Sequence, residues 1–176
     1  MIGEAELRRL TAGRWLAPVL AQVAEEKGSR FAGLLARLGL SRSVLAASLA
    51  ALQEAGWLIR NPGHGHPLRP EYVLTEAGAP VAAFCQRLMA ERVKLGLEPG
   101  QLPRWSLPLI VRLDGETARF TALRDALRPV TPRALSLTLK QMLQVDLVDR
   151  ALEDDFPPIA IYGLTGRGRE LAAAMR

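Results

Sequence analysis

The chain has 176 residues, about half of them apolar, with 23 basic and 18 acidic side chains and a formal net charge of +5. This composition excludes an extensively disordered chain and permits a polyanionic partner. A single cysteine excludes an internal disulfide framework and a multi-cysteine zinc site. There is no signal-like N-terminus, and no apolar stretch reaches the roughly 18 residues that span a bilayer. We therefore expect a soluble, cytoplasmic protein.

The first half of the chain begins with a series of predicted helices. Apolar residues recur at helical spacing over residues 14–26, and a second helix is predicted over residues 32–38. A tight turn at Gly39 follows, after which Ser41 caps a third helix. Along this third helix the leucines at 45, 49 and 52 lie on one face, so that face is predicted to be buried.

A β-hairpin and a long helix complete this half. Residues 57–60 and 69–74 are predicted strands, joined by a tip rich in proline and glycine. Thr75 begins a fourth helix that continues to about Leu95. Helix, helix, turn, helix and hairpin is the order of a winged helix-turn-helix domain. The turn-rich residues that follow place the boundary between two domains, 1–96 and 97–176.

The second half repeats the first at an offset of 90 residues, without a gap from Ser41 to Gly78. Chance does not give so long a colinear series, so the chain is a tandem duplication. We expect a mainly α fold with small β-hairpins (α+β), made of two tandem winged helix-turn-helix domains packed as a pseudo-dimer. The matching pairs include Trp15 with Trp105 (both predicted core residues), Pro18 with Pro108, Ser41 with Thr131, Arg60 with Arg150, Tyr72 with Tyr162 and Gly78 with Gly168.

Three segments of the second half carry a family resemblance: RWSLPLIVRL, RFTALRDALRPVTPRALSLTLKQML and YGLTGRGREL. In this order they resemble the HxlR-type winged-helix regulators, relatives of the MarR group, and the first half follows the same pattern. The resemblance implies a cytoplasmic bacterial regulator that binds operator DNA, usually as a dimer of single-domain chains. This chain departs from that pattern because it holds two domains, and because it lacks the N-terminal cysteine with which some members sense electrophiles.

The outer faces of the two third helices are the predicted DNA-reading surfaces. A helix in the major groove needs donors and acceptors for base edges and a positive N-terminus for phosphate. The second domain supplies these better than the first, whose alanines either contact thymine methyl groups or merely form helix. The candidates are Arg42, Ser43, Ala46 and Ala47 in the first domain, with Ala50 on the same face, and Thr131, Arg133, Ser136 and Lys140 in the second.

The hairpin tips, or wings, show the opposite asymmetry. The first wing contains His64, His66 and Arg69, which we expect along phosphates or in the minor groove. The second contains three consecutive acids from Glu153 to Asp155, which a phosphate backbone would repel. This tip either points away from DNA, toward another protein, or is a solvated acidic loop.

Two further arginines, Arg30 and Arg119, precede the second helix of each domain. They either contact phosphate near the start of the motif or cover a short β-strand. In the fourth helix Cys85 lies among apolar neighbours and is predicted to be a buried, unreactive thiol. The apolar face of that helix, Val81, Phe84, Cys85 and Leu88, is predicted to pack on the other domain or on another chain as a homodimer.

No catalytic constellation is present: the chain has no phosphate-binding glycine loop, nucleophile elbow or acid pair beside a base. We therefore expect no enzyme activity, no cofactor and no metal, since His64 and His66 alone are a weak metal pair.

The sequence predicts a sequence-specific regulator of transcription that binds double-stranded DNA, as a repressor, and recognises two half-sites that need not be identical. The alternative is a tandem winged-helix adaptor that binds protein through the acidic second wing. A third possibility is a small-molecule sensor with a pocket between the domains, which is compatible with the DNA-binding regulator.

Overall fold

The computed structural model describes residues 2–61, 70–98, 101–153 and 158–176. The chain divides into two compact units, Met1–Ala90 and Glu91–Arg176. The division falls within helix α5 (Gly78–Lys94), a few residues before the boundary expected from the turn-rich linker.

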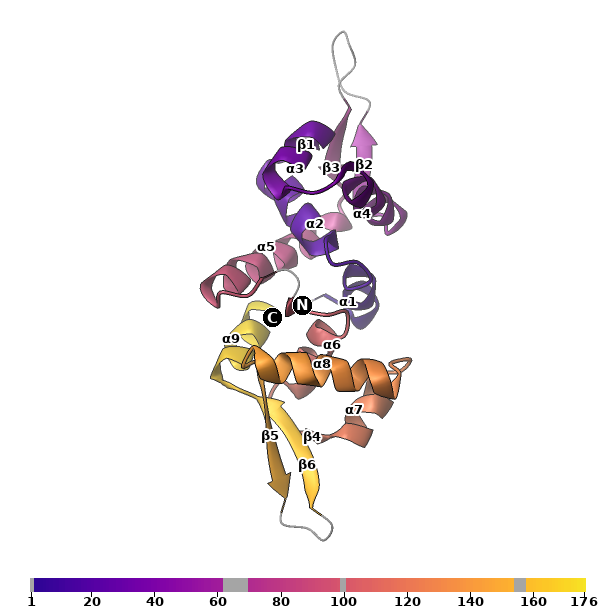
Figure 1. Cartoon of the computed structure of the whole chain (residues 1–176). Helices are drawn as coiled ribbons and strands as arrows, with labels where there is room; N and C mark the ends of the chain where they lie inside the picture. Colours follow the sequence, from indigo (N-terminus) through magenta and orange to yellow (C-terminus); the bar gives the residue numbers. More distant parts are fainter. Residues whose placement is uncertain (1, 62–69, 99–100, 154–157) are drawn as a thin grey trace. The chain divides into compact units, whose positions relative to one another are not determined.

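The described part of the first unit has helices packed on a small antiparallel sheet (Figure 1). The sheet order is β1-β3-β2, and Leu58 pairs with Leu74 in its register. The helical and strand order predicted from the sequence is confirmed. Its elements are α1 (Glu4–Leu10), α2 (Leu16–Glu25), β1 (Ser29–Arg30), α3 (Phe31–Leu38), α4 (Arg42–Glu54), β2 (Leu58–Asn61), β3 (Glu71–Leu74) and α5 (Gly78–Lys94).

The second unit repeats this arrangement, with sheet order β4-β6-β5 and Val148 paired with Leu164. Its strands β5 and β6 are longer than β2 and β3, and they form the second wing (Figure 1). Its elements are α6 (Ser106–Leu113), β4 (Ala118–Arg119), α7 (Phe120–Ala126), α8 (Pro132–Gln144), β5 (Val148–Glu153), β6 (Ile159–Leu164) and α9 (Gly166–Ala174).

Side-chain caps begin α4 and α8. The Ser41 hydroxyl accepts a hydrogen bond from the Val44 amide at 3.3 Å, and Thr131 accepts one from Ala134 at 3.2 Å. Pro132 occupies the start of α8, where no intrahelical amide donor is needed. Both predicted caps are therefore confirmed. The capped first turn of each helix is exposed to solvent.

The core of each unit is built around the inner face of the third helix of its motif. The predicted leucine stripe of α4 is buried, with Leu45, Leu49 and Leu52 at most 1% exposed. In α8 Leu135 and Met142 are fully buried in the same way. Trp15 and Trp105, predicted as core residues, are only half-buried, which corrects that expectation.

A close backbone approach is repeated in both units. A Cβ atom on Gly78 would lie 2.0 Å from the Trp57 carbonyl oxygen, and one on Gly168 would lie 2.0 Å from the Leu147 carbonyl oxygen. The same two carbonyl groups accept hydrogen bonds from the amides of Thr75 and Thr165. The first turn of the helix after each hairpin packs directly against the entry to the first hairpin strand, and only glycine leaves room for this approach.

No single helix in the described ranges is long and apolar enough to cross a membrane. Taken together, α3 and α4 reach the required length and composition, but they are bent by 117° at the break between them.

A candidate nucleic-acid interface

Helix α8 presents a polar, cationic face to solvent. Its buried side is formed by Leu135, Thr138, Leu139 and Met142. On the other side Arg133, Ser136 and Lys140 are exposed, and Leu137 lies among them with 58% of its surface accessible. Figure 1 shows α8 lying across the front of its unit, with α6 behind it. The donors needed to contact base edges are therefore on the surface of this unit.

The two cationic side chains of this face are not paired with acids of the described chain. Arg133 and Lys140 have no hydrogen-bond or ion-pair partner among the described residues. The capped N-terminus of α8 adds a partial positive charge next to Arg133. A phosphate or a base edge would therefore not have to displace an acid from either side chain.

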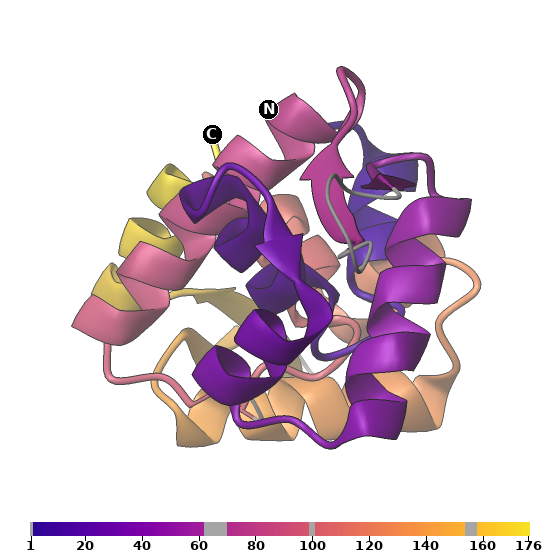
Figure 2. The ribbon, with the colours of Figure 1, turned by 90° about the horizontal axis from the view of Figure 1, so that it is seen from above.

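Helix α4 presents a different surface at the equivalent positions. Its exposed side carries Ala46, Ala47 and Ala50, and Ser43 and Ala50 stand where α8 has Arg133 and Lys140. Arg42 is exposed, without a partner among the residues that the structure describes, and the Ser43 hydroxyl lies 3.1 Å from the Ser41 hydroxyl. Figure 2 shows α4 beside α3, to which a short turn joins it. This helix offers close approach but few donors.

The two arginines that precede the second helices are held against their own sheets. Arg30 Nε lies 3.1 Å from the Glu71 carboxylate, and Arg119 Nη2 lies 2.6 Å from the Glu153 carboxylate. All four side chains are partly exposed, so each pair is a surface ion pair of modest strength. Phosphate contacts by Arg30 and Arg119 stay a prediction, and they would have to compete with these acids.

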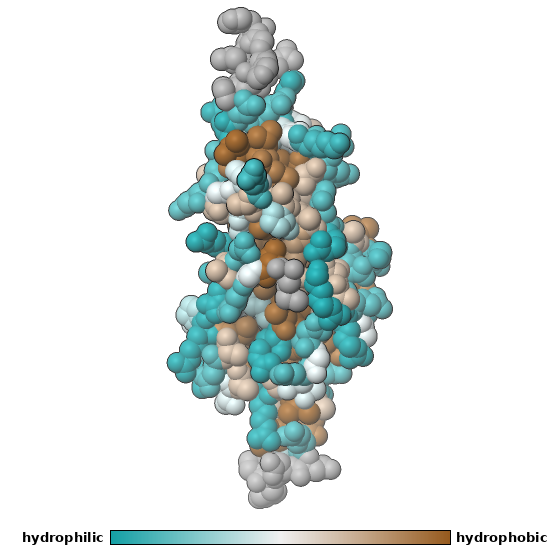
Figure 3. All heavy atoms as spheres, turned by 180° about the vertical axis from the view of Figure 1, so that it is seen from behind, coloured by the Kyte–Doolittle hydropathy of each residue, from teal (hydrophilic) through white to brown (hydrophobic). Residues whose placement is uncertain are grey.

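Most of the predicted wing contacts fall outside the described residues, namely His64, His66, Arg69, Asp154 and Asp155. Of the three consecutive acids in the second wing, Glu153 is described, and its charge is matched by Arg119. Leu152 beside it is 59% exposed, and Figure 3 shows apolar surface at the lower end of the view, where β5 and β6 lie. In the described ranges no three His, Cys, Asp or Glu side chains gather as a metal site.

Two arginines near the start of α8 were not predicted as functional residues from the sequence: Arg124 in the last turn of α7 and Arg128 in the turn that follows. The Asp125 carboxylate accepts hydrogen bonds from Arg128 and Arg124, each at 3.2 Å, and these contacts lower the pKa of that carboxyl. Two guanidinium groups share one carboxylate, so the cluster keeps a net positive charge. The sequence did contain a signal for this cluster. Arg128 lies three residues before Thr131, the cap of α8, and is therefore close to the predicted DNA-reading helix.

Cys85 is fully buried in α5, and burial raises the pKa of its thiol far above the usual range. The thiolate is the reactive form, so a thiol that stays protonated at neutral pH is a poor nucleophile. The prediction of a buried thiol is confirmed.

We expect Cys85 in the folded chain to react with a disulfide reagent such as Ellman's reagent at least about 100-fold more slowly than in the denatured chain, because exposure requires opening of the core. Thiol titration with and without guanidinium measures this. Comparable rates in the two conditions would contradict the burial of Cys85.

Two units with the same helix–turn–helix motif and antiparallel hairpin make this a tandem winged helix-turn-helix protein. The HxlR-like helix-turn-helix model matches it twice, over residues 10–95 and 102–176. The chain belongs to the HxlR family.

The chain is also similar to individual regulators. It is 32% identical over 68 residues to the HTH-type transcriptional regulator sll1512 of Synechocystis, covering 39% of this chain and 50% of that relative. The chain therefore spans half the length of the curated relative. A MarR-family regulator from Enterococcus faecalis V583 is 30% identical, with coverage of 48% of this chain and 77% of that one and a TM-score of 0.44. The reduced form of the transcriptional regulator YodB from B. subtilis is 27% identical, with coverage of 48% of this chain and 78% of that one and a TM-score of 0.40.

Proposed function

We propose that this chain is a transcription regulator that binds specific sites on double-stranded DNA and represses transcription by occupying promoter DNA in the cytoplasm. The observation that carries the proposal is the outer face of α8, where Arg133, Ser136 and Lys140 are exposed and the two cations have no acid partner among the described residues. Membership of a helix-turn-helix family supports the same function.

The two units contribute unequally in this proposal. Helix α8 supplies hydrogen-bond donors to base edges, whereas α4 supplies Arg42, Ser43 and an alanine surface that packs against thymine methyl groups. Because the two helices differ, the chain recognises two half-sites of different sequence. The operator then need not be palindromic, although single-domain relatives that dimerise would require a symmetric site.

A homodimer through α5 is a separate expectation. Val81, Phe84, Cys85 and Leu88, the face predicted to pair, are each at most 1% exposed within this chain. That face is already covered, so one chain with two units is the simplest DNA-binding species. Sedimentation at increasing concentration distinguishes the two arrangements.

Salt dependence tests the function directly. We expect the affinity for genomic DNA fragments to fall steeply with salt, with a slope of log K against log [salt] of about −0.9 for each phosphate neutralised. Fluorescence anisotropy of the full chain with labelled fragments, titrated at several salt concentrations, gives the slope. A chain that fails to bind DNA even at low salt would instead support the adaptor function, with the second wing as its protein-binding surface.

A further inference from the structure

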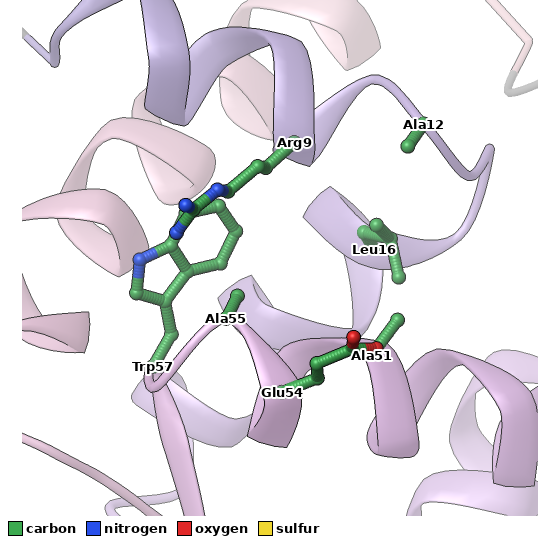
Figure 4. A pocket seen from close by; sticks show the side chains of 7 residues that line it. All are labelled: Arg9, Ala12, Leu16, Ala51, Glu54, Ala55 and Trp57. Carbon is green, nitrogen blue, oxygen red and sulfur yellow. The ribbon is translucent and has the colours of Figure 1, made fainter.

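A pocket of about 310 Å³ lies in the first unit, at the C-terminal end of α4. This volume is at the small end of the range for sites that bind small molecules. Figure 4 shows the side chains that form its walls. It is lined by residues from α1, the turn after it, the start of α2, the end of α4 and the entry to β2, namely Arg9, Ala12, Leu16, Ala51, Glu54, Ala55 and Trp57.

The pocket combines an apolar interior with opposite charges at its opening. Trp57 and Leu16 are 3% and 6% exposed, so they form fixed apolar walls. Arg9 and Glu54 are exposed, and neither has a hydrogen-bond or ion-pair partner among the described residues. In Figure 4 the Arg9 side chain points toward the Trp57 ring, and the Glu54 carboxylate lies on the side of Ala51. Both charges are thus available to a ligand.

The internal repeat shows that this space is not required by the fold. At the equivalent positions of the second unit, Gln141 replaces Ala51 and Val145 replaces Ala55. Leu147 replaces Trp57, and Gln144 replaces Glu54. The second unit therefore has larger side chains where the first has two alanines, and it has neither the indole ring nor the acid.

We propose that this pocket binds a small zwitterionic molecule with an aromatic body, and that the ligand acts as an effector. The aromatic body lies against Trp57 and Leu16, the anionic group of the ligand pairs with Arg9, and its cationic group pairs with Glu54. Ligand contacts with Ala51, Glu54 and Ala55 are contacts with the last turns of α4, so binding biases the position of that helix. The effect on DNA rests on the function proposed above, whereas ligand binding does not.

Three probes with the same phenylalkyl body separate the charges: L-phenylalanine, 2-phenylethylamine and 3-phenylpropionate. Titration calorimetry of the full chain, without DNA, is expected to show saturable binding of L-phenylalanine and about three- to tenfold weaker binding of the two singly charged probes. Equal affinity for all three, or no saturable binding of any at millimolar concentration, would overturn the proposal.

Variants taken from the second unit provide matched controls. Ala51→Gln with Ala55→Val is expected to abolish binding of every probe, because the side chains of the second unit fill the space; an unchanged thermal transition shows that the variant is folded. Glu54→Gln should weaken L-phenylalanine and 2-phenylethylamine but not 3-phenylpropionate, and Arg9→Gln should weaken L-phenylalanine and 3-phenylpropionate. Undiminished binding to the Ala51→Gln/Ala55→Val double variant (the filled variant) would place the ligand site elsewhere and contradict the assignment of the ligand to this pocket.

The effector role has its own readout. A saturating concentration of L-phenylalanine is expected to change the dissociation constant for DNA several-fold in the wild-type chain and not in the filled variant. An unchanged constant in the wild type, with ligand binding demonstrated by calorimetry, would overturn the effector role. Absence of DNA binding with or without ligand would instead refute the proposed function and leave the ligand site to be judged on the calorimetry.

Discussion

Replacing Arg133 and Lys140 together by alanine is expected to weaken binding to a specific duplex by about 2–6 kcal/mol, since each lost base contact costs about 1–3 kcal/mol. Both side chains are exposed on α8 and have no partner among the described residues, so the substitutions remove DNA contacts without breaking an internal one. Anisotropy titration against a selected site measures the loss. Thermal unfolding should be nearly unchanged.

Two sets of controls sharpen this prediction. Arg112→Ala with Arg176→Ala removes the same amount of charge from ion-paired positions of the second unit, and should cost little affinity. In α4, Ala50 stands at the position of Lys140, and Ala50→Glu introduces a repelling charge there. If Ala50→Glu costs as much as the double alanine variant or more, α4 rather than α8 is the principal recognition helix.

Gly168→Ala is expected to destabilise the protein by about 2–4 kcal/mol, because the new Cβ would lie 2.0 Å from the Leu147 carbonyl oxygen and the backbone must shift. Gly78→Ala should act in the same way against the Trp57 carbonyl oxygen. Denaturant unfolding followed by circular dichroism measures the change in free energy of unfolding.

Gly33 provides the matched control for these substitutions. It lies in α3, and a Cβ there would meet nothing within 4 Å. Gly33→Ala should therefore stabilise the chain by about 0.5–1 kcal/mol, through the helix propensity of alanine. A Gly168→Ala variant as stable as the wild type would contradict the close contact between α9 and the Leu147 carbonyl group.

The sequence was sufficient to predict the repeated architecture because its signals are local and occur twice. Ser41 and Thr131 lie directly before periodic apolar segments, so their roles as caps followed from position alone. Helix α1 was not predicted, since it has only 7 residues and too few apolar positions to show a helical period. Thr75 was predicted to begin α5; instead its hydroxyl accepts a hydrogen bond from Gly78, where the helix starts.

Long-range contacts could not be predicted in this way. The ion pairs Arg30–Glu71 and Arg119–Glu153 join residues that are distant in sequence and meet only through strand pairing. The match of Gly78 with Gly168 was visible, but the carbonyl group that excludes a side chain there was not. In α8, by contrast, the helical period alone placed Arg133, Ser136 and Lys140 on the outer face, and the structure has all three exposed.

The most direct test of DNA recognition through α8 is to map the genomic DNA that the full chain retains, in parallel with the Arg133→Ala/Lys140→Ala variant. We expect a limited set of discrete sites for the wild-type chain, with two unlike half-sites in each, and loss of these sites in the variant. Identical retention by both proteins, or no enrichment of any sequence by the wild type, would contradict a regulator that recognises DNA through α8.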